Sequence, residues 1–157
     1  MEANRTEHDQ FLQPTTKRKI LIVDDNKDLV KILEMALNVW GHDVRVANDG
    51  LSGIEMAHSF VPDVVILDIG MPGMDGYAVC KVMRKDPKLK NSLFIAQTGW
   101  GSPEHRRLSK DAGFHYHLVK PFDLASLHLL LESKEFDDGE ELDNIRFHPG
   151  KYGTNKK

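Results

Sequence analysis

Each of four short apolar runs in this 157-residue chain ends in a side chain that suits phosphoryl chemistry. In chain order these side chains are Asp24-Asp25, Asp68, Thr98 and Lys120. Clustered carboxylates bind Mg²⁺, and a carboxylate can accept a phosphoryl group as an acyl phosphate. An ammonium and a hydroxyl can stabilise the transferred group. If the fold brings these side chains together, they form a magnesium-dependent site with Asp68 as the acceptor.

Asp68 lies in the most informative stretch, DVVILDIGMPGMDG (63–76). The run Val64–Leu67 has the length and β-branched content of a strand that is buried on both faces. A glycine- and proline-rich loop follows it. An acid at the carboxyl end of such a strand stands where open α/β sheets bind their ligands.

The other elements are predicted by hydrophobic periodicity and by capping signals. Strands are expected at about 19–23, 44–47, 63–68, 92–97 and 115–119. Helices are expected at about 27–40, 50–60, 76–85 and 103–112, with a last helix that Asp123 caps. Alternating strands and helices predict an α/β fold, with a five-stranded parallel sheet and helices on both faces. The carboxyl ends of all the strands then lie along one edge, where the polar side chains meet.

Each of these side chains also has an ordinary structural interpretation. The acidic pair Asp24-Asp25 could cap the following helix, and Asp68 could begin a turn. Thr98 could be a plain strand end, and Lys120 a surface lysine. Their joint occurrence favours a site, because uncompensated like charges in one cleft cost stability.

At these positions the chain resembles the receiver domain of two-component response regulators, such as single-domain chemotaxis receivers. The resemblance covers about 19–132 and rests on four segments in order: ILIVDDN, DVVILDIGMPGMDG, IAQTG and HLVKPF. It implies a flavodoxin-like sheet with the strand order 2-1-3-4-5. It also implies that a sensor histidine kinase or a histidine phosphotransfer protein donates the phosphoryl group.

The resemblance also implies roles for the acids. Asp68 corresponds to the phosphorylated aspartate and to a magnesium ligand. Asp25 corresponds to a direct Mg²⁺ ligand, and Asp24 to one that acts largely through metal-bound water. The backbone carbonyl of Gly70 would complete the protein ligands.

Further roles concern switching and the lifetime of the phosphoryl group. Thr98 and Lys120 correspond to the switch hydroxyl and the lysine that bind the phosphoryl group. His117 stands where receivers often have a rotating Tyr or Phe, so either the imidazole takes that role or His117 is a strand residue at a partly exposed surface. Gly70 and Trp100 occupy positions that tune dephosphorylation. Gly70 lacks a side chain to orient water and Trp100 could shield the site, so we expect slow self-dephosphorylation.

The domain prediction is a flexible tail over 1–17, a receiver domain over 18–132 and a C-terminal tail over 133–157 without an effector domain. We therefore expect a stand-alone phosphoacceptor rather than an enzyme. It would signal by relay, or by protein contact through the face formed by 103–112, 115–119 and the last helix. A binding-only receiver-like module is an alternative. An aspartyl-phosphate phosphohydrolase is disfavoured because no Asp-x-Asp motif follows the first strand.

Composition excludes few classes but agrees with this interpretation. The net charge of −3 gives no support for a DNA partner, and no apolar run approaches the 18 residues of a membrane-spanning helix. The single cysteine, Cys80, lies among apolar residues and is expected to be buried as a small hydrophobic side chain. One cysteine without an internal disulfide partner suits the cytoplasm.

Overall fold

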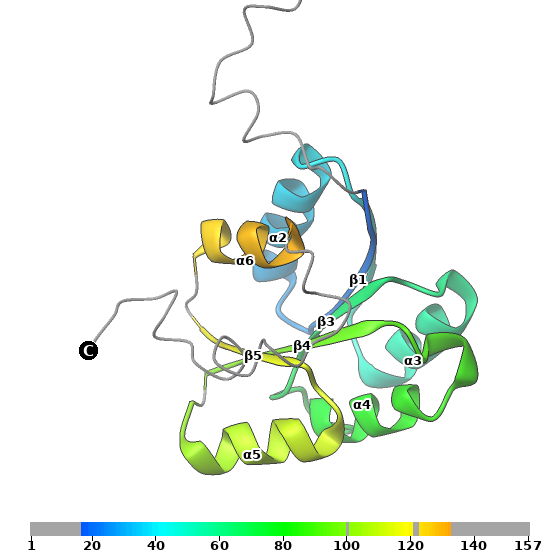
Figure 1. Cartoon of the computed structure of the whole chain (residues 1–157), viewed down its shortest axis with the longest axis vertical. Helices are drawn as coiled ribbons and strands as arrows, with labels where there is room; N and C mark the ends of the chain where they lie inside the picture. The colour runs from blue at the N-terminus through cyan, green and yellow to red at the C-terminus, as the bar shows by residue number, and fades with distance from the viewer. Residues whose placement is uncertain (1–16, 100, 121–122, 133–157) are drawn as a thin grey trace, which may run out of the picture.

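A parallel β-sheet forms the middle layer of the protein, with helices on both of its faces (Figure 1). The computed structural model describes residues 17–99, 101–120 and 123–132. The five strands lie in the order β2-β1-β3-β4-β5, and every neighbouring pair is parallel. Their bounds are β1 Lys19–Val23, β2 Asp43–Ala47, β3 Val64–Asp68, β4 Leu93–Thr98 and β5 Tyr116–Val119. The predicted fold class and strand order are confirmed.

The helices begin where the sequence supplies a capping side chain. Their bounds are α2 Lys27–Val39, α3 Gly50–Phe60, α4 Gly76–Arg84, α5 Pro103–Ala112 and α6 Leu124–Glu132. The Ser102 hydroxyl accepts the His105 backbone N–H at the start of α5, and Asp123 Oδ1 accepts the Ser126 backbone N–H in α6. A short 3₁₀ helix, η1 (Pro87–Leu89), follows α4 and was not predicted from the sequence.

Two apolar layers sandwich the sheet. Helices α2 and α6 cover one face, and α3, α4 and α5 lie on the other (Figure 1). Successive strand residues point to opposite faces, so Ile20 and Ile22 pack toward α2 while Leu21 and Val23 pack in the second layer. The three central strands, β1, β3 and β4, are buried along nearly their whole length.

Cys80 lies in the second apolar layer and is fully buried, as expected. Burial raises the pKa of its thiol to about 12, so the side chain is a neutral thiol at physiological pH. In the described part of the chain, no helix is long and apolar enough to cross a membrane. The predicted tails lie outside the described residues, apart from Lys17.

A buried histidine stands between α2 and β2. His42 is only 4% exposed, and its Nδ1 accepts the backbone N–H of Arg18 at 3.0 Å. Its Nε2 has no hydrogen-bond partner among the described residues. Burial lowers the pKa of His42 from its ordinary value of 6.5; Arg18 and His128 lower it further, and Glu132 opposes the shift.

This histidine makes folding sensitive to mild acid. In the unfolded chain the imidazole of His42 binds a proton below a pH of about 6.5, whereas the folded protein binds that proton less readily. The free energy of unfolding is therefore highest above this pH and decreases as the pH falls below it. We expect the free energy of unfolding to fall between pH 7 and pH 5.5, and to fall less in His42→Gln. Denaturant titrations at both pH values measure this, and equal pH dependence in the two proteins would contradict it.

Candidate functional site

The carboxyl ends of four strands meet in register at one edge of the sheet. Val23 of β1 pairs with Leu67 of β3, and Asp68 at the end of β3 pairs with Gln97 of β4. Thr98 at the end of β4 pairs with Val119 of β5. The residues that follow β1 and β5 therefore lie at the same level as Asp68, and the structure brings the three carboxylates and Lys120 together.

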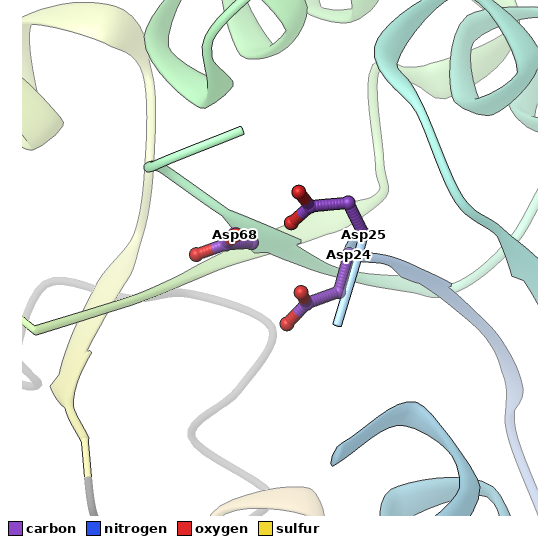
Figure 2. Close-up of side chains that lie close together, drawn as sticks. All are labelled: Asp24, Asp25 and Asp68. Atoms are coloured by element: carbon purple, nitrogen blue, oxygen red, sulfur yellow. The ribbon is translucent and has the colours of Figure 1, made fainter. Parts of the chain in front are cut away.

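Three carboxylates form the centre of this edge. Asp24, Asp25 and Asp68 offer oxygens that all lie within 4.8 Å of one another. Figure 2 shows the three side chains extending to the same side of the strand ends. Asp24 and Asp68 are buried and Asp25 is exposed, so the cluster opens to solvent on one side. Hard carboxylate oxygens at this spacing fit Mg²⁺, which takes a few protein oxygens and keeps several waters.

Lys120 places a positive charge beside two of these acids. Its Nζ lies 3.2 Å from Oδ1 of Asp68 and 3.5 Å from Oδ2 of Asp24. One ammonium thus offsets part of the repulsion among three carboxylates. Thr98 is 1% exposed, and its strand is the direct neighbour of β3, which ends in Asp68.

Asp24 is the most constrained of the acids. Its Oδ1 accepts the backbone N–H of Asn26 at 2.9 Å, and its Oδ2 accepts the side-chain amide of Gln97 at 2.7 Å. Burial raises the pKa of Asp24; the Asn26 hydrogen bond lowers it, and the charge of Asp68 raises it further. A cation at this site would therefore be favourable, because it would compensate a charge that burial disfavours.

Gln97 is a site residue that the sequence analysis missed. The only signal was an amide inside the apolar run SLFIAQ, at the position before Thr98. The sequence does not show which residue the amide contacts, because Asp24 lies 73 residues away.

The loop after β3 approaches Asp68 closely. The backbone N–H of Gly70 lies 3.3 Å from Asp68 Oδ1. A Cβ atom on Gly76 would overlap the backbone carbonyl of Asp68, so only glycine fits at the start of α4. The role of the Gly70 carbonyl as a metal ligand stays a prediction, and Trp100 lies outside the described residues.

His117 is buried, which corrects one of its two interpretations. It pairs with Ala96 across β4 and β5, so it points into the apolar layer beside α5 and is 1% exposed. Its Nδ1 lies 2.8 Å from the hydroxyl of Ser109 in α5. The interpretation of a strand residue at a partly exposed surface was therefore wrong, because α5 covers this end of β5.

Comparisons with known proteins agree with this geometry. Residues 20–132 match the family model described as the response regulator receiver domain. The chemotaxis protein CheY4 of Vibrio cholerae superimposes with a TM-score of 0.71 and 31% identity, over 74% of this chain and 97% of that one. The receiver domain of sensor histidine kinase PA1611 from Pseudomonas aeruginosa, with a magnesium ion in its active site cleft, superimposes with a TM-score of 0.68 and 28% identity, over 74% and 95%.

Curated relatives are longer than this chain. A probable transcriptional regulator, ycf27 of Guillardia theta, is 43% identical over 107 residues, which are 68% of this chain and 41% of that protein. The chain spans less than half the length of the first curated relatives that it matches.

The carboxylate cluster predicts a Mg²⁺-dependent gain in stability. A cation at one hundred times its Kd raises the free energy of unfolding by about 2.7 kcal/mol. We expect Asp25→Asn to lose most of that gain. In EDTA it should be at least as stable as the unsubstituted protein, because one of three like charges is gone. Thermal denaturation with and without Mg²⁺ measures both effects. A variant that is destabilised in EDTA and keeps the full Mg²⁺ gain would contradict this prediction.

Proposed function

The chain belongs to the response regulator receiver domain family, and from this premise we propose that its Asp68 carboxylate accepts a phosphoryl group. Receiver domains are in general phosphoacceptors rather than enzymes. The observation that supports Asp68 most directly is its double contact: it lies within the carboxylate cluster and 3.2 Å from the Lys120 ammonium. A phosphoryl group on this side chain would meet positive charge from Lys120 and from a cation among the acids.

The two oxygens of Asp68 differ in their surroundings. Oδ1 contacts the Lys120 ammonium and the Gly70 backbone N–H, whereas Oδ2 has no hydrogen bond to any described residue. We assign the attack to Oδ2. It forms a bond to phosphorus while the bond from phosphorus to the donor's imidazole nitrogen breaks, and the imidazole leaves with the electron pair and takes up a proton.

The acids would hold Mg²⁺ for this step. Asp25 and Asp68 would bind it directly, Asp24 through a metal-bound water, and Gly70 through its backbone carbonyl. When bound, the ion supplies positive charge that neutralises phosphoryl oxygens. Lys120 now forms an ion pair with the Asp68 carboxylate, and after phosphorylation it would form one with the phosphoryl oxygens instead.

The same proposal includes a switch through β4 and β5. Thr98 would donate its hydroxyl hydrogen bond to a phosphoryl oxygen, and the end of β4 would follow it. His117 pairs with Ala96 of that strand and contacts Ser109 of α5. The His117 imidazole would therefore couple the site to the face formed by α5, β5 and α6, where a downstream protein would bind.

The proposed phosphodonor is a sensor histidine kinase or a histidine phosphotransfer protein. Relay and protein contact remain the proposed routes of output. The stand-alone arrangement and the lack of a DNA partner stay predictions, because the relatives that the chain matches are longer and one is described as a probable transcriptional regulator.

Phosphorylation of Asp68 is tested by intact mass after incubation with Mg²⁺ and acetyl phosphate. We expect an adduct of one phosphoryl group that EDTA prevents and that is absent in Asp68→Asn. Asp63→Asn, which changes an exposed acid immediately before the same strand, is the matched control and should be modified normally. If Mg²⁺ binds but no adduct forms, the chain is a binding-only module and the proposal fails.

The lifetime of the adduct provides a second test. Gly70 is exposed and lacks a side chain that could orient a hydrolytic water, so we expect slow loss of the phosphoryl group. Gly70→Asn adds an amide and should shorten the half-life at least about tenfold. Gly70→Ala restricts the backbone in a similar way but adds no amide, so it should leave the half-life of the adduct nearly unchanged. A half-life of seconds in the unsubstituted protein would contradict the prediction.

A further inference from the structure

Gln97 is an unusual residue for its place in the fold. It lies in β4, a central strand whose residues are all buried, and its own side chain is 0% exposed. A buried amide costs free energy unless both of its ends are hydrogen-bonded. A valine or leucine would fill this position without that cost, so a specific contact is needed to explain the amide.

The contact is to the carboxylate cluster. Gln97 Nε2 lies 2.7 Å from Asp24 Oδ2, the distance of a strong charge-assisted hydrogen bond. The opposite amide orientation would place the carbonyl oxygen against a carboxylate, so the amide nitrogen must be the donor. Gln97 is also the register partner of Asp68 on β3, so it adjoins two of the three acids.

The other end of the amide is not satisfied. Gln97 Oε1 is buried and has no hydrogen-bond partner among the described residues. A lone buried acceptor of this kind is destabilising, because it has lost its hydrogen bonds to water and gained none in the fold. The fold thus tolerates an unfavourable carbonyl in order to place the amide nitrogen on Asp24.

The effect of this hydrogen bond is to fix the direction of the Asp24 carboxylate. The Asn26 backbone N–H holds only Oδ1, which would let the carboxylate pivot about that atom. Repulsion from Asp25 and Asp68, whose oxygens lie within 4.8 Å, would turn Oδ2 away from the cluster. Gln97 prevents the pivot, and Lys120 at 3.5 Å from Oδ2 supports the same orientation.

We infer that Gln97 is a positioning residue for the magnesium site, which it orders through the Asp24 carboxylate before the ion binds. This inference rests on the proposed function of the site. Some residues orient metal-binding carboxylates through hydrogen bonds, and their replacement typically lowers the metal affinity 10–100-fold. Gln97 should therefore govern the affinity for Mg²⁺, and the rate of phosphorylation at saturating Mg²⁺ should depend on it much less.

The test compares Gln97→Met with the unsubstituted protein in Mg²⁺ titrations followed by calorimetry. Methionine matches glutamine in length but has no N–H donor. We expect the Kd for Mg²⁺ to rise at least about tenfold. The melting temperature in EDTA should change little, because the lost hydrogen bond is offset by removal of the unsatisfied carbonyl. Acetyl phosphate should modify the variant at close to the normal rate once Mg²⁺ saturates it.

Two further variants separate positioning from general packing. Gln97→Asn keeps the amide but is too short to maintain the contact, so it should weaken Mg²⁺ binding as well. Ser92→Ala removes a buried hydrogen bond, from the Ser92 hydroxyl to the Pro62 carbonyl, at the far end of β4. It should lower the melting temperature and leave the Kd for Mg²⁺ unchanged.

The outcomes are distinguishable. If the folded Gln97 variants bind Mg²⁺ as tightly as the unsubstituted protein, the inference is wrong while the proposed function stands. If Ser92→Ala weakens Mg²⁺ binding as much as Gln97→Met does, the effect is one of strand packing and the inference is again wrong. If the unsubstituted protein itself does not bind Mg²⁺, the proposed function fails too.

Discussion

Repulsion among three carboxylates at one sheet edge is the constraint on which the rest of this structure depends. Asp24, Asp25 and Asp68 have oxygens within 4.8 Å of one another, and two of these acids are buried. Such an arrangement would relax by rotation of the side chains unless the backbone and its neighbours opposed it. Lys120 offsets part of the charge, and the remaining negative charge favours a bound cation.

The sheet supplies the rigidity that this repulsion requires. β1 and β3 are buried on both faces and paired in register, so the backbone of Asp24 and Asp68 cannot move apart without breaking the sheet's hydrogen bonds. Gly76 permits α4 to begin against the carbonyl of Asp68, where any side chain would collide. The acids are thus close because the main chain is fixed, and the side-chain contacts only refine their directions.

Sequence patterns were sufficient for the parts that depend on local periodicity. Apolar runs and capping side chains predicted all five strands and the acids at the strand ends. The order of the strands was predicted from the resemblance to receiver domains. They could not predict contacts between side chains that are distant in sequence, such as Gln97 with Asp24 or His117 with Ser109. His117 shows the reason: alternation assigns a strand residue to one face, but whether a helix covers that face depends on the packing of α5. The 3₁₀ helix η1 could not be predicted in this way, because three residues are too few to show a periodicity.

Two adjacent residues of β4, Gln97 and Thr98, connect the proposed magnesium site with the proposed switch toward α5. Gln97 and Thr98 point to opposite faces of the sheet, because strand residues alternate. Gln97 faces Asp24 and the acids, whereas Thr98 shares the face of Ala96 and His117, beside α5. A shift of Thr98 toward a phosphoryl group would therefore move the backbone that also carries the Gln97 amide. Occupancy of the acid cluster and the position of α5 would then be coupled through one strand end, and linkage requires that a partner bound to α5 alter the affinity for Mg²⁺ in return.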